Sequence, residues 1–511
     1  MRLMSRLLSG GALALLGTQA FALTGEEVWA NQNSYLAGLG VKVSQTQTRA
    51  GNVLTVSDIS YDVTFPFGVG DMSLRAAPQI YTENADGSVS IDLGDANSFA
   101  VAATFRPDDL TEISLSANID ITWTGLRATA TGTANDVTYV TTADLIEITL
   151  ADLTISGAPE ADGVDVDVYL SVADSVSSTQ ITTGDTTVMR GTATSGQAIT
   201  DFGSSFFGDI LSKTVSLQSG TETTFDLTLP AGPMNLMNIS QALRDGLALA
   251  ATVNTGPSQS QAVTTVNGEV ITNQTTNIGS QSSMVSFDAA GLAISGDAVD
   301  ARVALTASPE IPFALDMTIG QVEYRFALPV NASDQPVDVV YAIGMSELTL
   351  NEGLWAMVDA AGTFPRDPMS LDIDLAGSVI ILTDLLDINA MTSVIDAGQM
   401  PFEVQSVTIN NLSANAVGAA LAGSGRFTLD MTDLTTFDGF PRPEGTATAT
   451  MTGVNALLDK LVAAGLMTAD DAMAGRLGMG MFAEVTGEDQ LRSTLEINAE
   501  GEVIANGQRI K

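Results

Sequence analysis

Carboxylates are the main residues of this sequence that could do chemistry, because it has 60 Asp and Glu, 20 Lys and Arg, no His and no Cys. Without His, catalytic Ser-His-Asp or Cys-His groups and imidazole metal ligands are excluded. Without Cys, disulfides and thiolate metal sites are excluded. Among so many carboxylates, some must lie in close pairs by number alone. Such pairs therefore do not identify an active site. An acid-base enzyme stays an alternative, but no activity and no catalytic residue are predicted.

One acidic stretch could hold a hard cation. Asp162, Asp165 and Asp167 place three oxygen donors close together, as calcium prefers. However, the stretch lacks the Gly and the closing Glu of the twelve-residue calcium loop, and Asp165 and Asp167 fall on the polar side of a predicted strand. Solvated charges on a strand are the simpler interpretation. We therefore predict no metal site.

One glycine-rich stretch resembles a cofactor motif. Residues 478–483 match the dinucleotide fingerprint in its Ala-ending form, but they follow a predicted helix and not a strand. A flexible apolar stretch whose Met side chains fill irregular gaps is the simpler interpretation. No Lys follows a Gly, so the phosphate-binding loop that ends in Gly-Lys-Ser/Thr is also absent. We predict no cofactor and no cofactor-binding residue.

The charge of the chain limits its partners. A formal net charge of −40 repels phosphates over the whole surface, so nucleic acid is not expected as a partner. The same charge disfavours electrostatic docking on anionic lipid head groups. Contact with the acyl chains of lipids is left open.

The first 22 residues have the features of a secretory signal peptide. Arg2 and Arg6 precede an apolar run from Leu7 to Leu16, and small residues flank Phe21 in Ala20-Phe21-Ala22. We expect cleavage after Ala22 and export to the periplasm. The run is about ten residues long, too short to cross a bilayer as a helix, although an N-terminal anchor or a buried first helix is the alternative. No later apolar run is long enough to span a membrane, so no transmembrane helix is expected in the mature chain.

Helices are expected at both ends of the mature chain. Thr24 and Glu27 have the spacing of a capping box, and Gly40 suits a helix C-terminus. The apolar face of this first helix would comprise Val28, Tyr35, Leu36 and Leu39. Near the other end, Asn455 to Ala464 and a segment starting at Thr468 predict a helix pair. Two connecting helices are expected within residues 234–247 and 350–361.

Between these helices the apolar residues recur with a period of two. The clearest run alternates with polar residues and comprises Ile113, Leu115, Ala117, Ile119, Ile121 and Trp123. A second run comprises Val164, Val166, Val168, Leu170 and Val172. Such alternation predicts antiparallel strands with one apolar face. Asp86-Gly87, Asn267-Gly268 and Asn506-Gly507 favour tight hairpins between strands.

A short phrase recurs at irregular intervals along these segments. It has an apolar residue, a spacer, an acidic or amide residue, Leu or Ile, and then Ser or Thr. Its copies begin at Val56, Leu150, Met345, Ile409 and Met431. Two apolar residues three apart suit a strand that bulges and then turns the same face inward again. Chance repetition in an Asp-rich, strand-rich sequence is the alternative.

The chain is therefore expected to be mainly β. Extended curved antiparallel sheets, groove-like or sandwich-like, would carry a short N-terminal helix, a few connecting helices, and a C-terminal helix pair plus β-hairpin. We predict a signal peptide at 1–22, an N-terminal β-rich lobe at 23–251, a polar hairpin or linker at 252–285, a second β-rich lobe at 286–450, and the C-terminal helix pair and β-hairpin at 451–511.

Both ends of the chain resemble a known family. Residues 27–29 (Glu-Val-Trp), 478–482 (Gly-Met-Gly-Met-Phe), 487–489 (Gly-Glu-Asp) and 501–510 are similar to those of alphaproteobacterial secreted proteins known only as a domain of unknown function. This resemblance implies a periplasmic β-rich protein without assigned activity. The strand style is also similar to that of AsmA-like envelope proteins, whose curved sheets form an apolar groove thought to hold lipid.

Three functions are left open. The leading hypothesis is a non-catalytic periplasmic protein that binds a lipid or another apolar ligand on a concave sheet. The first alternative is a structural or interaction module of the cell envelope, with an envelope protein as its partner and its apolar face buried sheet on sheet. The second alternative is an outer-membrane β-barrel, which also has alternating strands behind a signal peptide. The scarcity of Tyr and Trp argues against the barrel.

Overall fold

The computed structural model describes residues 22–65, 70–106, 112–157, 164–206, 209–306 and 314–511. Strands make up 64% of the structure and helices 12%, which confirms the predicted mainly β class. The predicted signal peptide lies outside the described residues except for Ala22, so its cleavage stays a prediction.

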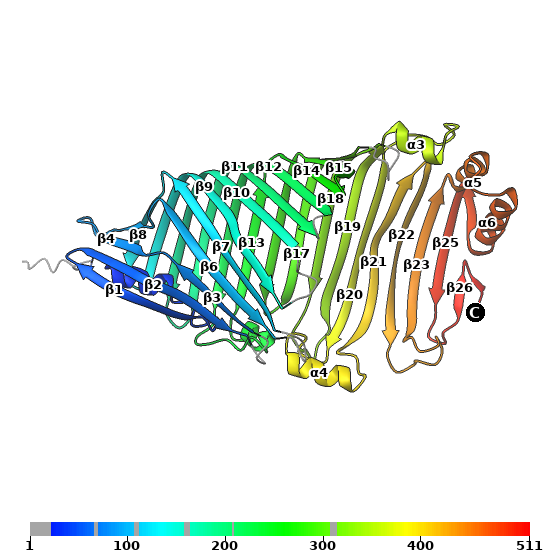
Figure 1. The fold of residues 1–511 in the computed structure, drawn as a ribbon. Coiled ribbons are helices and arrows are strands. Elements are labelled where there is room, and N and C mark those ends of the chain that lie inside the picture. The colour runs from blue at the N-terminus through cyan, green and yellow to red at the C-terminus, as the bar shows by residue number, and fades with distance from the viewer. Residues whose placement is uncertain (1–21, 66–69, 107–111, 158–163, 207–208, 307–313) are drawn as a thin grey trace, which may run out of the picture.

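The described strands form one continuous antiparallel sheet, which extends along the whole molecule (Figure 1). Its first edge is β1, which pairs with β2 alone. The strands up to the middle of the chain are β1 (Lys42–Ala50), β2 (Val53–Thr64), β3 (Gly70–Ala76), β4 (Gln79–Glu83), β5 (Val89–Asp92), β6 (Ala96–Phe105), β7 (Ile113–Thr124), β8 (Arg127–Thr133), β9 (Asp136–Ser156), β10 (Val164–Thr183), β11 (Thr187–Phe206) and β12 (Ile210–Leu229).

The sheet continues without a break through the second half of the chain. These strands are β13 (Ala248–Thr255), β14 (Ser258–Val266), β15 (Glu269–Ile278), β16 (Ser280–Asp288), β17 (Gly291–Leu305), β18 (Leu315–Leu328), β19 (Val337–Leu350), β20 (Met369–Ile381), β21 (Phe402–Ala416), β22 (Ala419–Asp430), β23 (Arg442–Thr452), β24 (Glu484–Gly487), β25 (Gln490–Ile497), β26 (Val503–Ala505) and β27 (Gln508–Arg509). The lobe boundaries that the sequence suggests around residues 252–285 stay a prediction. The residues there form β14 and β15, joined at Asn267-Gly268 with positive φ at both residues, and parts of β13 and β16.

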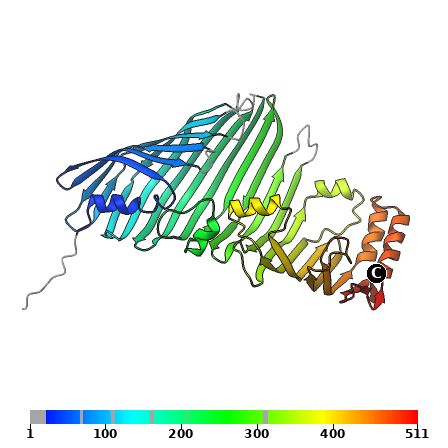
Figure 2. The ribbon, with the colours of Figure 1, turned by 90° about the horizontal axis from the view of Figure 1, so that it is seen from below.

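Six helices lie among these strands in the described ranges. They are α1 (Gly25–Gln32), α2 (Ile239–Arg244), α3 (Glu352–Val358), α4 (Ile388–Asp396), α5 (Val454–Ala463) and α6 (Ala469–Phe482). The pair α5 and α6 at the end of the chain confirms the predicted C-terminal helix pair. α2 and α4 lie side by side at one rim of the sheet (Figure 2), and Arg244 at the end of α2 forms an ion pair of 2.8 Å with Asp384, which lies just before α4. Within the described residues, every helix is too short or too polar to cross a lipid bilayer.

The helix α1 covers the first part of the sheet. Its capping box is formed as predicted, with the Thr24 hydroxyl accepting from the Glu27 backbone and the Glu27 carboxylate accepting in return. Val28 and Trp29 are buried against a cluster of sheet residues. This cluster includes Leu54, Val56, Ile59, Tyr81, Val89, Ile91, Ala130, Val137, Tyr139 and Ile181.

The predicted length of this first helix was wrong. α1 ends at Gln32, and the segment up to Gly40 forms turns instead. The Asn33 side-chain amide donates to the Trp29 carbonyl at 2.8 Å, and the Ser34 hydroxyl donates to the Asn31 carbonyl at 2.7 Å. The same carbonyls also accept from the backbone, that of Trp29 from Asn33 at 3.3 Å and that of Asn31 from Ser34 at 3.2 Å. The side chains therefore add to the bonds of the last turn, as short polar residues do at helix ends.

The recurring phrase forms β-bulges in four of its five copies. In β2, the residues Asp58 and Ile59 stand opposite one residue of β1, and the φ of Asp58 is 53°. Asp152 and Glu347 have φ values of 54° and 55° at matching shifts in register. The copy in β21 also shifts the register, between Ile409 and Leu412, whereas the last copy lies in the turn after β22. Since Val56 and Ile59 are both fully buried, the bulge returns the apolar residues to the same face, as predicted.

The bulge in β2 gives a direct test of this backbone geometry. A β-branched residue is strained at positive φ, so Asp58→Val should lower the free energy of unfolding by about 1–2 kcal/mol. Asp58→Gly should keep it within about 0.5 kcal/mol, and so should Ser57→Val at the neighbouring extended position. Urea denaturation of the three variants measures these changes. Equal stability of Asp58→Val and Ser57→Val would contradict the bulge.

Candidate functional site

The two faces of the sheet differ, and α1 identifies one of them. We define the inner face as the side of the sheet on which α1 lies, marked by Val56, Tyr81, Val137 and Ile181. Because side chains alternate along a strand and directly paired residues share a face, the register extends this definition from strand to strand. The opposite side is the outer face. Figure 2 shows the first strands curling over α1.

In β18, side chains on the inner face are more sheltered than those on the outer face. In β18, Val322, Tyr324 and Phe326 point inward and are half-buried, whereas Gln321, Glu323 and Arg325 point outward and are exposed. A flat sheet would expose both faces equally. The inner face is therefore the more sheltered one in β18, whereas in β19 the inward-pointing Tyr341 is exposed and the outward-pointing Gly344 is buried.

A line of apolar residues crosses the inner face from β11 to β25. Each member is paired directly with the next, so all of them share the face. This central row comprises Gly191, Phe225, Ala251, Val285, Ile294, Phe326, Tyr341, Leu375, Ile409, Gly425, Ala447 and Leu495. At about 4.8 Å between strands, it runs for roughly 50 Å.

An aromatic cluster lies in the middle of the central row. The rings of Tyr324 and Phe326 are 5.9 Å apart, and those of Phe326 and Tyr341 are 5.2 Å apart in an edge-to-face arrangement. Tyr341 keeps 44% of its surface exposed, so this apolar area is open to solvent. In the sequence, the alternation of polar and apolar residues over 321–326 is the signal that indicates this cluster.

On the inner face, apolar side chains give way to polar ones in the first half of β12. In β12, the sheltered positions shift by one at Ser219-Gly220. Beyond that point Thr214 and Ser216 point inward, whereas Val215 and Leu217 are exposed on the outer face. The apolar residues of this part of β12 therefore share one face, as alternation predicts, but it is the outer face and not the inner one.

A pocket lies on the inner face beside α1. Its volume is about 360 Å³, and none of the described residues that line it is charged. Its aromatic lining comprises Trp29, Tyr35, Tyr61 and Tyr139, and its polar lining comprises Gln32, Asn33, Gln79 and Thr179. Tyr35 also lines a neighbouring hollow of about 570 Å³ at the rim of the sheet. The pocket could therefore hold an apolar group together with an uncharged polar one.

Hydrogen bonds fix Tyr139, which lines this pocket, and the buried Tyr81, which bonds to Gln79 of the lining. The Tyr139 hydroxyl lies 2.9 Å from the Asn31 side-chain oxygen, and the Tyr81 hydroxyl donates to Gln79 at 2.6 Å. Burial raises the pKa of Tyr139 above its ordinary value, and burial also raises the pKa of Tyr81. Both side chains are therefore neutral hydrogen-bond donors at physiological pH.

These raised pKa values predict how the protein responds to alkali. The folded state holds both protons more tightly than the unfolded state, so this contribution to stability is complete below about pH 10 and lost as the pH rises above it. The tyrosinate absorbance at 295 nm should show a late phase that coincides with unfolding. A Tyr81→Phe, Tyr139→Phe double variant should show a smaller late phase, to which Tyr35 and Tyr61 still contribute because burial also raises their pKa. A wild-type titration in one step near pH 10 would contradict the burial of these hydroxyls.

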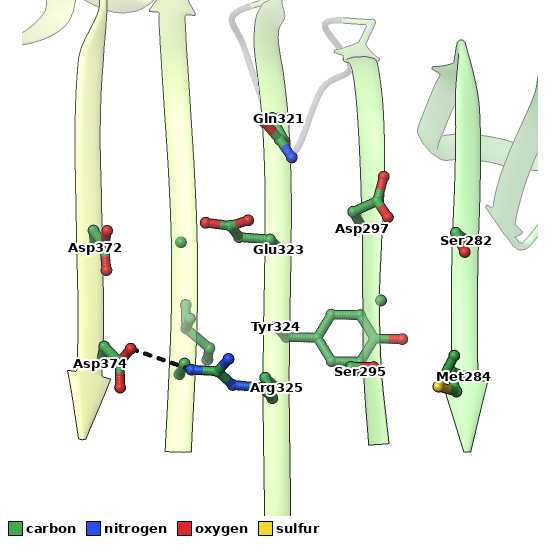
Figure 3. A pocket seen from close by; sticks show the side chains of 14 residues that line it. Ser282, Met284, Ser295, Asp297, Gln321, Glu323, Tyr324, Arg325, Asp372 and Asp374 are labelled. Carbon is green, nitrogen blue, oxygen red and sulfur yellow. Dashed lines mark hydrogen bonds and ion pairs between the residues drawn. The ribbon is translucent and has the colours of Figure 1, made fainter. Parts of the chain in front are cut away.

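A separate hollow of about 520 Å³ lies on the outer face over β16 to β20 (Figure 3). Its charged side chains are mostly acidic: Asp297, Glu323, Asp372 and Asp374, with Arg325 paired to Asp374 at 3.2 Å. Figure 3 shows these carboxylates spread over neighbouring strands. Within the described ranges, no group of three or more acidic side chains is arranged to hold a metal ion.

The stretches that the sequence analysis considered for chemistry do not come together in the structure. Asp165 and Asp167 are exposed in β10, whereas Asp162 lies outside the described residues. Residues 478–482 belong to α6, and Ala483 is its C-cap, so the glycine-rich stretch lies within a helix instead of opening one after a strand. The arrangement that a dinucleotide fingerprint requires is therefore not formed there.

Comparison with known proteins agrees with the resemblance seen at the C-terminus. A family model described as an uncharacterized protein conserved in bacteria (DUF2125) matches residues 215–507, more than half of the chain. The chain belongs to this family. No curated protein matches it. The matched segment includes β13 to β26, both C-terminal helices and most of the central row.

Proposed function

We propose that this protein is exported to the periplasm and that its inner face binds the acyl chain of a lipid or a similar elongated apolar ligand. The central row is the observation that carries the proposal. Its side chains are apolar on successive strands from β11 to β25, and Tyr341 in its middle remains 44% exposed. Water contact with such an area is unfavourable, at roughly 25 cal/mol per Å² of apolar surface.

The arrangement of the sheet supports a ligand in place of a second sheet. The strands in the described ranges all belong to one sheet, so a sandwich partner for the inner face is not found among them. The helices contact the sheet mainly near its ends and rims, as α1 does at β2, β4 and β10. A ligand chain lying along the central row would cover apolar area that these helices leave open.

The polar features around the inner face narrow the ligand class. The pocket beside α1 offers uncharged amide and hydroxyl groups, among them Gln32, Asn33 and Thr179. A net charge of −40 disfavours anionic groups throughout. We therefore expect the ligand to have an apolar chain and an uncharged or zwitterionic polar end. The resemblance to AsmA-like proteins points the same way, but the proposal does not depend on it.

Native mass spectrometry of protein purified from the periplasm without detergent tests the proposal. We expect bound species whose masses correspond to lipids, released by organic extraction and recovered in the lipid fraction. Protein that is folded and carries no extractable lipid, and that takes up none from added vesicles of phosphatidylethanolamine, would contradict it. That result would favour the alternative of an interaction module without a small ligand.

A further inference from the structure

The helix α6 carries an apolar stripe that faces solvent. Met473, Leu477 and Met481 follow one another at intervals of four residues, so they lie on one side of the helix. Their side chains are 63%, 66% and 67% exposed. A helix at the surface of a soluble protein normally turns such a stripe toward its own core.

The other side of α6 is already occupied. Ala472 is buried, and Arg476 reaches α5, where it donates to Asp459 at 2.6 Å and to the Asn455 carbonyl at 3.0 Å. An added side-chain carbon at Gly475 would lie 4.0 Å from Leu458 of α5. The position of the stripe is therefore not explained by contact with α5, because α6 meets α5 through different residues.

Small residues flank the stripe in a symmetrical pattern. Ala474 and Gly480 lie three residues before and after Leu477, whereas Met473 and Met481 lie four residues before and after it. All five of these residues are exposed, and an added side-chain carbon at Gly480 would touch nothing within 4 Å. Glycine weakens a helix by about 1 kcal/mol relative to alanine. It is favoured where a second backbone must approach closely.

We propose that α6 is a self-association surface, on which two copies of this chain pair through antiparallel α6 helices. A two-fold axis at Leu477 places each Leu477 against its counterpart and each Met473 beside Met481 of the second copy. The ridge formed by residues 473, 477 and 481 of one copy then packs into the shallow positions at Ala474 and Gly480 of the other copy. The pattern is self-complementary because it reads alike in both directions from Leu477.

The charges near the stripe favour a second copy over a membrane. Helices that lie on membranes carry Lys and Arg on their polar face. The one basic residue of α6, Arg476, is paired with Asp459, and Asp470 and Asp471 make the first turn acidic. Since each copy also carries a net charge of −40, electrostatic repulsion opposes pairing, and added salt should strengthen it.

Sedimentation velocity of the full protein over a range of concentrations tests this pairing. We expect a monomer–dimer equilibrium whose dissociation constant falls when the salt is raised from about 0.05 to 0.5 M. Leu477→Asp should raise the dissociation constant at least about tenfold, because two carboxylates would then face each other at the axis. Met400→Asp, at a methionine that is 65% exposed outside α6, should leave the constant unchanged.

A second variant separates pairing from folding. Gly480→Ala should raise the thermal stability of α6 and yet weaken the dimer, because it stabilises the helix but fills the place of close approach. Circular dichroism monitors the fold of each variant. Protein that stays monomeric up to 200 µM, or a dimer that Leu477→Asp leaves unchanged, would overturn the proposal. So would binding to phosphatidylethanolamine vesicles that is lost in Leu477→Asp while the wild type stays monomeric.

Discussion

Replacing Val285 by Asp should weaken binding of a phosphatidylethanolamine with a fluorescent acyl chain at least about tenfold, a loss of about 1.4 kcal/mol. Val285 lies in the central row, paired with Ala251 on one side and Ile294 on the other. A carboxylate there would be buried by the ligand without a partner, which is unfavourable by several kcal/mol. A fluorescence titration of wild type and variant, with competition by unlabelled phosphatidylethanolamine, measures the change.

The adjacent residue provides the matched control. Met284 belongs to the same strand, β16, but points to the outer face and is 53% exposed. Met284→Asp therefore introduces the same charge one residue away, on the side where we expect no ligand. Its affinity should stay within about twofold of the wild type. Equal loss of affinity in both variants would show that the charge acts on the whole strand, which contradicts binding to the inner face alone.

Removing the Trp29 side chain should have the largest effect on stability. Trp29 is buried between α1 and the sheet, with its ring 6.3 Å from that of Tyr81 in an edge-to-face arrangement. Replacement of a buried tryptophan by alanine typically lowers the free energy of unfolding by about 3–5 kcal/mol. Hydrogen exchange should then become faster in α1 and in the strands that it covers, β2 and β4.

The effect should be confined to the part of the sheet that α1 covers. Exchange in β22 and β23, which lie far along the sheet, should not change in Trp29→Ala. Ala30→Ser, at the exposed neighbour of Trp29, should leave exchange in β2 and β4 as in the wild type. Uniform loss of protection along the chain would contradict a local core. Normal exchange in β2 and β4 of Trp29→Ala would contradict the role of α1.

Strands and bulges could be predicted because their signals are local. The alternation of apolar and polar residues over 113–124 is visible in the sequence alone, and β7 occupies that range. The bulge at Asp58 could be predicted because a spacer pair separates Val56 from Ile59, and the acidic residue between them adopts positive φ. Capping of α1 was predictable for the same reason, since Thr24 and Glu27 are three residues apart.

The central row could not be predicted, because it depends on register between strands that are distant in sequence. Gly191 and Ala447 belong to it, and neither residue by itself indicates an apolar surface. The register also determines where the pattern fails, since the sequence around Val215 alternates regularly but places its apolar residues on the outer face. The length of α1 depended on side-chain hydrogen bonds of Asn33 and Ser34, which periodicity does not reveal.

Photo-crosslinking from within the sheet is the most direct test of a lipid-binding inner face. A benzophenone amino acid placed at Val285, or one residue away at Met284, reports which face of the sheet a lipid touches in living cells. The account predicts a lipid adduct from position 285, detected by mass spectrometry of the crosslinked peptide, and none from position 284. Adducts of equal yield from both positions, or from position 284 alone, would contradict it.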